Sequence, residues 1–194
     1  MSISSAQLKE LRDQTGISVM QCKKALEEAS GDMEKALVIL RKKGAEAASK
    51  KSDRAFGAGV IGVYTHNTNE VAAMVHVACE TDFVAKNEQF VTLARDIAMQ
   101  VAAMNPKYLN RNEVDDQALE AAKSVFQAEV ADKPAELQEK IMGGKLDAYF
   151  KDMILLEQPF VKNNDQTIQQ MIESAIQAFG ENISIISFSR MSTK

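Results

Sequence analysis

The amino-acid sequence predicts an α+β protein, built from an N-terminal three-helix domain and a larger body whose small antiparallel sheet is covered by helices. Apolar residues recur at helical spacing through residues 5–40. Two adjacent segments between residues 59 and 79 instead alternate with a period of two and are rich in β-branched side chains. Helical spacing returns after residue 87 and continues, with interruptions, to residue 179. Helices therefore precede and follow a pair of strands.

The N-terminal domain is expected to span residues 1–44 and to contain three short helices. The first covers about Ser5–Gln14, and Ser18 is a favourable N-cap for the second. Asp32 is expected to cap the third, where its carboxylate also suits the helix dipole. This helix is expected to end in three basic residues followed by Gly44, which is typical of a helix C-terminus. The side chains expected in the core of the domain are Leu8, Leu11, Cys22, Ala25, Leu26, Ala29, Met33, Ala36, Leu37 and Leu40.

Residues 45–56 are predicted to form a basic linker between the two parts of the chain. The stretch 41–54 holds six basic and two acidic residues and almost no large apolar side chain, so it cannot bury itself. The charge balance also changes here, because residues 1–56 hold 11 basic and 8 acidic residues and the remainder holds 12 and 19. Such a shift across a polar stretch is typical of a domain boundary.

The body, residues 57–194, is expected to begin with a β-hairpin. Gly59–Thr65 and Glu70–Cys79 are the predicted strands, and the segment His66–Asn69 between them has the composition of a turn. Alternate positions of the second strand share one apolar face, which we expect to be buried. The residues on this face are Val71, Ala73, Val75, Val77 and Cys79.

Further helices are expected to cover the sheet. An amphipathic helix follows residue 87 and ends near Asn105–Pro106. Residues 115–156 are predicted to form an antiparallel helical hairpin around Lys133–Pro134, with Gly143–Gly144 as a kink or interruption in its second helix.

The chain is expected to close with one more helix and one more strand. Helical spacing predicts a helix over about Asp165–Phe179, and Gly180 is a typical end for it. Asn182–Arg190 then has the character of a strand. The body is therefore expected to contain a small antiparallel sheet with helices packed on it.

Composition and charge exclude several classes of protein. The chain has 194 residues, is 45% hydrophobic and has a formal net charge of −4. No apolar stretch approaches the roughly 20 residues that cross a bilayer, and the first residues contain no signal-peptide core. We therefore expect no membrane association and a cytoplasmic location. The mild acidity also argues against direct binding of nucleic acid.

The sequence offers little catalytic chemistry. Cys22 and Cys79 fit neither a disulfide framework nor a metal motif, and only His66 and His76 could join them as metal ligands. No glycine-rich phosphate loop is present. A cysteine enzyme that uses Cys79 and His76 is one alternative. Odd and even positions of a strand face opposite ways, however, so these two side chains should not meet. We therefore expect Cys79 to be a buried core residue. We predict a protein that is not an enzyme and that uses no cofactor or metal.

The segment Cys79–Asn87, which reads Cys-Glu-Thr-Asp-Phe-Val-Ala-Lys-Asn, leaves a buried strand and enters a helix within a few residues. Two interpretations of this corner are open. In the first, Thr81 or Asp82 caps the helix and Phe83 packs in the core. In the second, the acid and the aromatic ring are presented together as a probe that enters a partner. Spacing alone favours the first interpretation.

Ordered blocks along nearly the whole chain resemble the bacterial elongation factor Ts family. Any one block alone would be a weak signal, whereas the ordered set is highly specific. The blocks are Leu11–Gly16, Met20–Leu26, Gly31–Asp32, Glu80–Asn87, Leu155–Phe160 and Glu181–Ile183.

This resemblance implies a guanine-nucleotide exchange factor that binds elongation factor Tu and promotes GDP release. The N-terminal helices would form a ubiquitin-associated-like docking domain, and Met20 and Lys23, which lie off the buried stripe of their helix, are the expected docking residues. Thr81–Val84 match the segment that dislodges magnesium from the partner, with Asp82 and Phe83 intruding beside the phosphate site. The length is similar to the short form of the family, for which a homodimer is expected. The alternative is a module that binds ubiquitin-like or nascent chains through the N-terminal helices alone.

Overall fold

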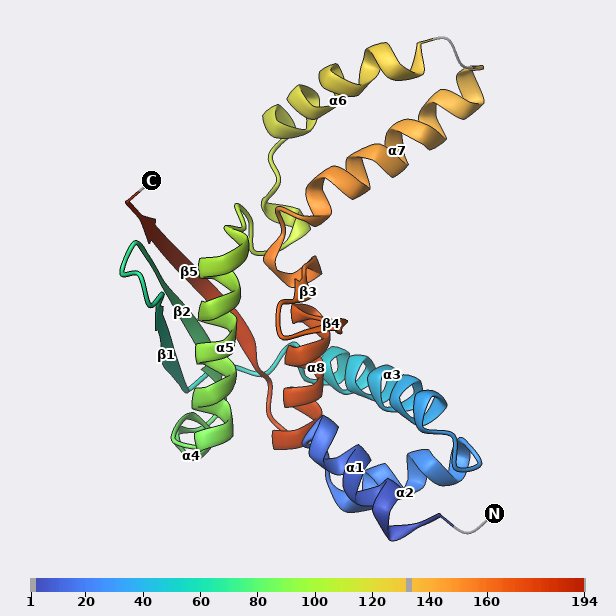
Figure 1. Ribbon diagram of the computed structural model, residues 1–194, viewed down its shortest axis with the longest axis vertical. Coiled ribbons are helices and arrows are strands. Elements are labelled where there is room, and N and C mark those ends of the chain that lie inside the picture. Colours follow the sequence, from blue (N-terminus) through green and yellow to red (C-terminus); the bar gives the residue numbers. More distant parts are fainter. Residues whose placement is uncertain (1–2, 132–133, 194) are drawn as a thin grey trace.

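The computed structural model describes residues 3–131 and 134–193, and it confirms an α+β fold with a small antiparallel sheet. The sheet lies at one side of the molecule, the N-terminal helices gather at the lower end, and a helical hairpin projects from the opposite end (Figure 1). Within the described ranges, none of the helices combines the length and the apolar character needed to cross a membrane.

Three helices form the N-terminal part: α1 (Ser5–Thr15), α2 (Val19–Glu28) and α3 (Met33–Lys51). Ser18 and Asp32 cap α2 and α3 as predicted, since each side-chain oxygen accepts a hydrogen bond from a backbone N–H three residues further on. A separate hydrophobic core lies between these helices, and Leu8, Met33 and Leu37 pack against its edge. Its buried members are Leu11, Ile17, Cys22, Ala25, Leu26, Ala29, Ala36 and Leu40.

The sheet consists of β1 (Ala58–Thr65), β2 (Val71–Cys79) and β5 (Ser184–Ser192), with β2 in the centre and both pairings antiparallel. Helix α5 (Glu88–Met104) packs along one face of this sheet (Figure 1). The predicted alternation of β2 is confirmed, because the side chains expected to face the core are buried there and Val71 packs against them. The buried members are Ala73, Val75, Val77 and Cys79.

Gly62 of β1 lets α5 approach the sheet closely. A Cβ atom at this position would lie 2.2 Å from the backbone oxygen of Ala94 in α5, so no larger residue fits without a shift of the helix. The opposite face of the sheet is open, and the apolar side chains that the alternation places on it are exposed. They are Ile61, Val63, Met74 and Met191.

The predicted hairpin is formed by α6 (Asp116–Val130) and α7 (Ala135–Lys151), which lie side by side and point away from the body (Figure 1). Lys133 lies outside the described residues, and Pro134 is the N-cap of α7. Of the kink or interruption expected at Gly143–Gly144, the interruption is wrong, because α7 runs through both glycines. The helical hydrogen bonds on either side outweigh the roughly 1 kcal/mol per glycine by which these residues disfavour a helix.

The last helix, α8 (Ile168–Phe179), begins later than the predicted Asp165. Asp165 lies instead in β4 (Asn163–Thr167), which pairs with the two-residue strand β3 (Pro159–Phe160) and was not predicted. Thr167 sets the start of α8, because its hydroxyl and the side chain of the residue at N3 form a capping box.

Buried Gln100 of α5 explains how this unpredicted strand pair is held. Its Nε2 donates to Gln158 Oε1 at 3.1 Å, and its Oε1 accepts from the Val161 N–H at 2.9 Å. A polar residue on an otherwise apolar helix stripe thus satisfies backbone and side-chain groups of the segment that contains the strand pair.

Two short 3-10 helices, η1 (Arg111–Glu113) and η2 (Leu155–Glu157), lie at the base of the hairpin.

Helix α3 does not end at Gly44 as predicted but continues to Lys51, so most of the expected linker is helical. Gly44 is buried, and a Cβ atom there would lie 3.3 Å from the backbone oxygen of Glu173 in α8. Ala47 and Ala48 pack against the core of the body. The charged composition hid this packing, because the residues that make the contact are only Gly and Ala and form a narrow stripe. The alanines also favour a helix strongly, which helps α3 to continue past Gly44.

Candidate functional site

The corner between β2 and α5 contains the segment singled out in the sequence. A single helical turn, α4 (Asp82–Ala85), follows the end of β2, and Asn87 then caps α5. Thr81 is the N-cap of α4, and its Oγ1 accepts a hydrogen bond from the Val84 N–H at 3.4 Å. The cap role predicted for Thr81 or Asp82 therefore falls to Thr81.

Phe83 points into solvent, so its expected place in the core is wrong. Its exposed fraction is 79%, whereas that of the adjacent Val84 is 4%. Successive residues of a helix lie about 100° apart, so the side chains of Phe83 and Val84 leave this turn in different directions. Val84 packs with the body core, and this anchor turns the ring of Phe83 outward.

Asp82 places a carboxylate beside the exposed ring. Its Oδ2 accepts a hydrogen bond from Lys86 Nζ at 2.7 Å, and both side chains are exposed. This hydrogen bond and the charge of Lys86 lower the pKa of the Asp82 carboxyl below its usual value. The corner therefore presents an ionised acid and a phenyl ring next to each other.

A second segment, far away in the sequence, holds the start of this corner. Glu181 Oε2 accepts hydrogen bonds from the backbone N–H groups of Glu80 and Thr81, both at 3.0 Å. Glu181 Oε1 accepts from the Thr81 hydroxyl at 2.6 Å. Sequence reasoning missed this contact, although Glu181–Ile183 is one of the blocks that carry the family resemblance.

The reverse contact runs from Glu80 to the residue after Glu181. Glu80 Oε1 accepts from the Asn182 N–H at 2.6 Å and from Arg54 at 3.3 Å. The backbone hydrogen bond from Asn182, followed by the contact with Arg54, lowers the pKa of the Glu80 carboxyl. Asn182 is itself buried and donates through Nδ2 to the backbone oxygen of Arg54 at 2.8 Å.

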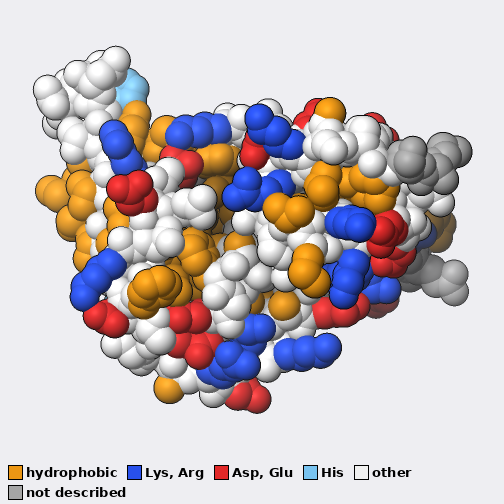
Figure 2. Space-filling view, turned by 90° about the horizontal axis from the view of Figure 1, so that it is seen from below, with side chains coloured by type: hydrophobic (Ala, Val, Ile, Leu, Met, Phe, Trp, Pro, Cys, Tyr) orange, Lys and Arg blue, Asp and Glu red, His pale blue; other side chains and the backbone are white. Residues whose placement is uncertain are grey.

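The predicted docking residues lie on the outer side of α2. Met20 is 70% exposed, and Lys23 is exposed with its Nζ 3.8 Å from Glu27. Helices α2 and α4 lie at the same end of the molecule (Figure 1), and the view from below shows apolar side chains scattered among Lys, Arg and acidic residues (Figure 2). The structure thus brings the two predicted groups to one end, on separate elements.

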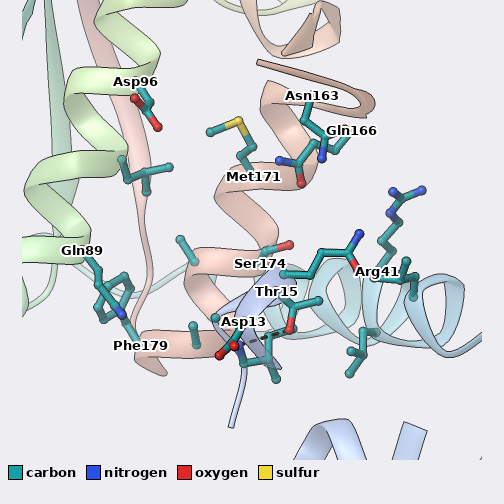
Figure 3. Close-up of a pocket in the computed structure, with 18 of the residues that line it drawn as sticks. Asp13, Thr15, Arg41, Gln89, Asp96, Asn163, Gln166, Met171, Ser174 and Phe179 are labelled. Carbon is teal, nitrogen blue, oxygen red and sulfur yellow. Dashed lines mark hydrogen bonds between the residues drawn. The ribbon is translucent and has the colours of Figure 1, made fainter. Parts of the chain in front are cut away.

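A cleft of about 410 Å³ lies between the end of α1, the first half of α3 and the body helices α5 and α8. Asp13, Arg41 and Asp96 line it together with residues of α8, and Figure 3 shows these side chains on different elements around the opening. In the part of the chain that the structure describes, no three His, Cys, Asp or Glu side chains are placed to hold a metal ion.

Cys79 has the character of a buried core thiol. It is free and fully buried, and its Sγ donates to the Thr81 backbone oxygen at 3.2 Å. Burial, and next the negative charge of Glu181, raises the pKa of the Cys79 thiol, which disfavours the nucleophilic thiolate. His76 lies on the other face of the strand, as expected, so the two side chains do not form a catalytic pair.

An aromatic ring exposed on an anchored turn, next to an ionised acid, suits a protein that acts by contact with another macromolecule, because aromatic side chains are enriched in protein interfaces. The comparisons agree with this class. The family model described as Elongation factor TS matches residues 5–193. The elongation factor Ts of Geotalea uraniireducens is 48% identical over 192 residues, which cover 98% of this chain and 89% of the relative. That of Carboxydothermus hydrogenoformans is 46% identical over 190 residues, covering 97% and 88%. The chain belongs to the elongation factor Ts family, whose members act in translation.

Proposed function

We propose that this protein is a guanine-nucleotide exchange factor that binds elongation factor Tu–GDP in the cytoplasm and promotes GDP release during translation elongation. The observation that carries the proposal is the exposed Phe83 beside Asp82, on a turn anchored by Val84, in a chain of the elongation factor Ts family. Phe83 has the highest exposed fraction among the large apolar side chains of the described residues, and aromatic side chains are enriched in protein interfaces.

The proposed mechanism requires no covalent chemistry. Factor and nucleotide weaken each other's hold on elongation factor Tu, and this coupling is reciprocal by linkage. Magnesium bridges the phosphate oxygens and the protein in nucleotide-binding sites, so a disturbed magnesium shell removes much of the nucleotide affinity. In this proposal Phe83 enters elongation factor Tu beside the magnesium shell as a wedge. The negative charge of the Asp82 carboxylate disturbs the interactions that hold the magnesium ion.

The N-terminal helices supply the docking surface in this proposal. We assign them to a ubiquitin-associated-like domain that binds the nucleotide-binding domain of elongation factor Tu through Met20 and Lys23. Met20 is exposed while Cys22 and Leu26 of the same helix are buried, so the outer face of α2 is free to pack on a partner. Docking there holds the factor in place while the corner at Phe83 acts.

A homodimer through the open face of the sheet completes the proposal. Side chains of Ile61, Val63, Met74 and Met191 are exposed on this face, and the positions between them on the same face are small or uncharged. Such a neutral face can pair with a second copy of itself around a two-fold axis. Met74→Lys should give a monomer in sedimentation at concentrations where wild type and the control Val125→Lys, on α6, are dimers; a monomeric wild type would contradict it.

The exchange activity is tested by release of labelled GDP from purified elongation factor Tu. Substoichiometric wild-type protein should accelerate release, because each factor molecule leaves one partner and acts on the next. Val125→Ala, altered on the exposed side of the projecting hairpin, should accelerate it equally. No acceleration with a cognate elongation factor Tu would contradict the proposed function.

A further inference from the structure

Helix α4 is too short to maintain its own geometry. It has four residues, Asp82–Ala85, and an isolated helical turn is unstable in water because nucleation fixes several dihedral angles for one hydrogen bond. The side chain of Val84 is anchored in the body core. The start of the turn, however, carries backbone N–H groups that no helical carbonyl can satisfy. The position of Phe83 therefore depends on the groups that bind Glu80 and Thr81.

A single carboxylate binds both residues. Glu181 receives the N–H groups of Glu80 and Thr81 on one oxygen and the Thr81 hydroxyl on the other. The Thr81 hydroxyl oxygen in turn accepts the N–H of Val84, the residue next to Phe83. Hydrogen bonds to an ionised acceptor are stronger than those between neutral groups, so this chain of contacts fixes the entry to α4.

Glu181 is itself held from the opposite direction. Asn182 donates its backbone N–H to Glu80 and its side-chain amide to the backbone of Arg54, so the start of β5 is tied to the end of β2 and to the residues after α3. Glu80 thus donates to Glu181 and accepts from Asn182, so the two segments exchange hydrogen bonds across about 100 residues of sequence. Movement of either segment alone would break several bonds to charged groups.

We propose that Glu181 is a positioning residue for nucleotide exchange, which holds the Thr81–Val84 turn so that Phe83 and Asp82 are presented in their working orientation. This inference rests on the proposed function. Glu181 is half-buried and both of its carboxylate oxygens bind Thr81, so in this proposal it acts through Thr81 and not on the partner. Its loss should lower the maximal rate of exchange more than the affinity for elongation factor Tu.

Two variants and a matched control test this role. Glu181→Ala removes all three hydrogen bonds, whereas Glu181→Gln keeps an oxygen for the two N–H groups and loses the charge. Glu173→Ala is the control, because Glu173 is also half-buried and its carboxylate accepts from Gln169 within α8. Amide hydrogen exchange at residues 80–84 of the isolated protein reports the turn directly, and GDP release at saturating factor reports its consequence.

We expect amide exchange at Glu80, Thr81 and Val84 to be at least about tenfold faster in Glu181→Ala, because the N–H groups of Glu80 and Thr81 lose their acceptor and the Thr81 hydroxyl that binds the Val84 N–H is no longer held. The maximal rate of GDP release should fall about tenfold, as for a turn that occupies its working geometry about one tenth of the time. The half-saturating concentration should stay within about twofold, and Glu181→Gln should be slowed only about threefold. Glu173→Ala should match wild type in both measurements.

Two results would overturn the inference while wild type remains active. One is a wild-type maximal rate in Glu181→Ala, and the other is a slow rate without faster amide exchange at residues 80–84. If Glu181→Ala does not fold, Glu181→Gln decides, and wild-type values in both measurements overturn the inference. A wild-type protein that fails to release GDP overturns the proposed function instead, and this result is distinct from a slow variant.

Discussion

Replacement of Phe83 by alanine distinguishes a partner probe from a structural side chain. The ring is 79% exposed, so about one fifth of its surface is removed from water by folding. Full burial of a phenylalanine stabilises a protein by about 1.5–3 kcal/mol, which makes the expected loss about 0.3–0.6 kcal/mol. A protein of this size loses about 2–4 °C per kcal/mol, so the melting temperature should fall by less than about 3 °C.

The matched control is Phe90→Ala, seven positions further along the same chain segment. Phe90 is fully buried in the body core, where its ring meets that of Phe179 at a centroid distance of 5.9 Å. Truncation of a buried phenylalanine costs about 3–5 kcal/mol, so this variant should melt about 6–20 °C below wild type. The pair therefore calibrates the thermal assay, which is followed by circular dichroism.

Phe83→Ala should have a large effect on the rate of nucleotide exchange, in contrast to its small effect on the melting temperature. An aromatic side chain at the centre of an interface contributes about 2 kcal/mol or more, which corresponds to a factor of about 30 in rate. Stopped-flow release of a fluorescent GDP from elongation factor Tu, at saturating Phe83→Ala, should be slower by this order. A wild-type maximal rate would refute the probe, and a fall in melting temperature of about 6 °C or more would show a structural role for the ring.

Three further variants test the acid, the docking face and the base of the hairpin. Asp82→Ala should keep a near-native melting temperature, because its pair with Lys86 is exposed, but slow GDP release at saturation; an unchanged rate would remove Asp82 from the mechanism. Met20→Ala should raise the half-saturating concentration several-fold with the maximal rate unchanged, as measured by titration of the factor, and a lowered maximal rate would contradict a docking role. Hydrogen bonding from Arg111 lowers the pKa of Glu157, so this carboxylate stabilises the fold above its ordinary pKa and the contribution is lost as the pH falls through the lowered value. Glu157→Gln should therefore melt below wild type at pH 7 but not in acid, and a difference in melting temperature that persists in acid would point to another cause.

Much of the fold could be predicted because local patterns determine it. The period of two from Val71 to Cys79 and the caps at Ser18 and Asp32 depend on neighbours within a few residues, and the structure confirms them. The end of α3 could not be predicted in this way. Its last turns are stabilised by packing of Gly44 on α8, about 130 residues away, while the local sequence shows only charge and small side chains.

The candidate site shows the same limit at closer range. The sequence identifies the Thr81–Val84 segment, but spacing in a helix of one turn does not determine whether Phe83 or Val84 enters the core. The structure resolves this through the anchor at Val84. The contacts of Glu181 lie beyond local reasoning, because they join segments about 100 residues apart and involve backbone N–H groups that no side-chain motif reveals.

The continuous helix α3 fixes both the distance and the rotation between the N-terminal core and the body. Leu40 belongs to the N-terminal core and Ala47 packs on the body, and seven helical residues advance about 10 Å and make about two turns. One residue inserted between Leu40 and Gly44 would swing α2 about 100° around the axis of α3, whereas seven inserted residues would restore its direction and move it about 10 Å further out. The number of residues in α3 therefore sets both the distance and the direction of Met20 relative to Phe83.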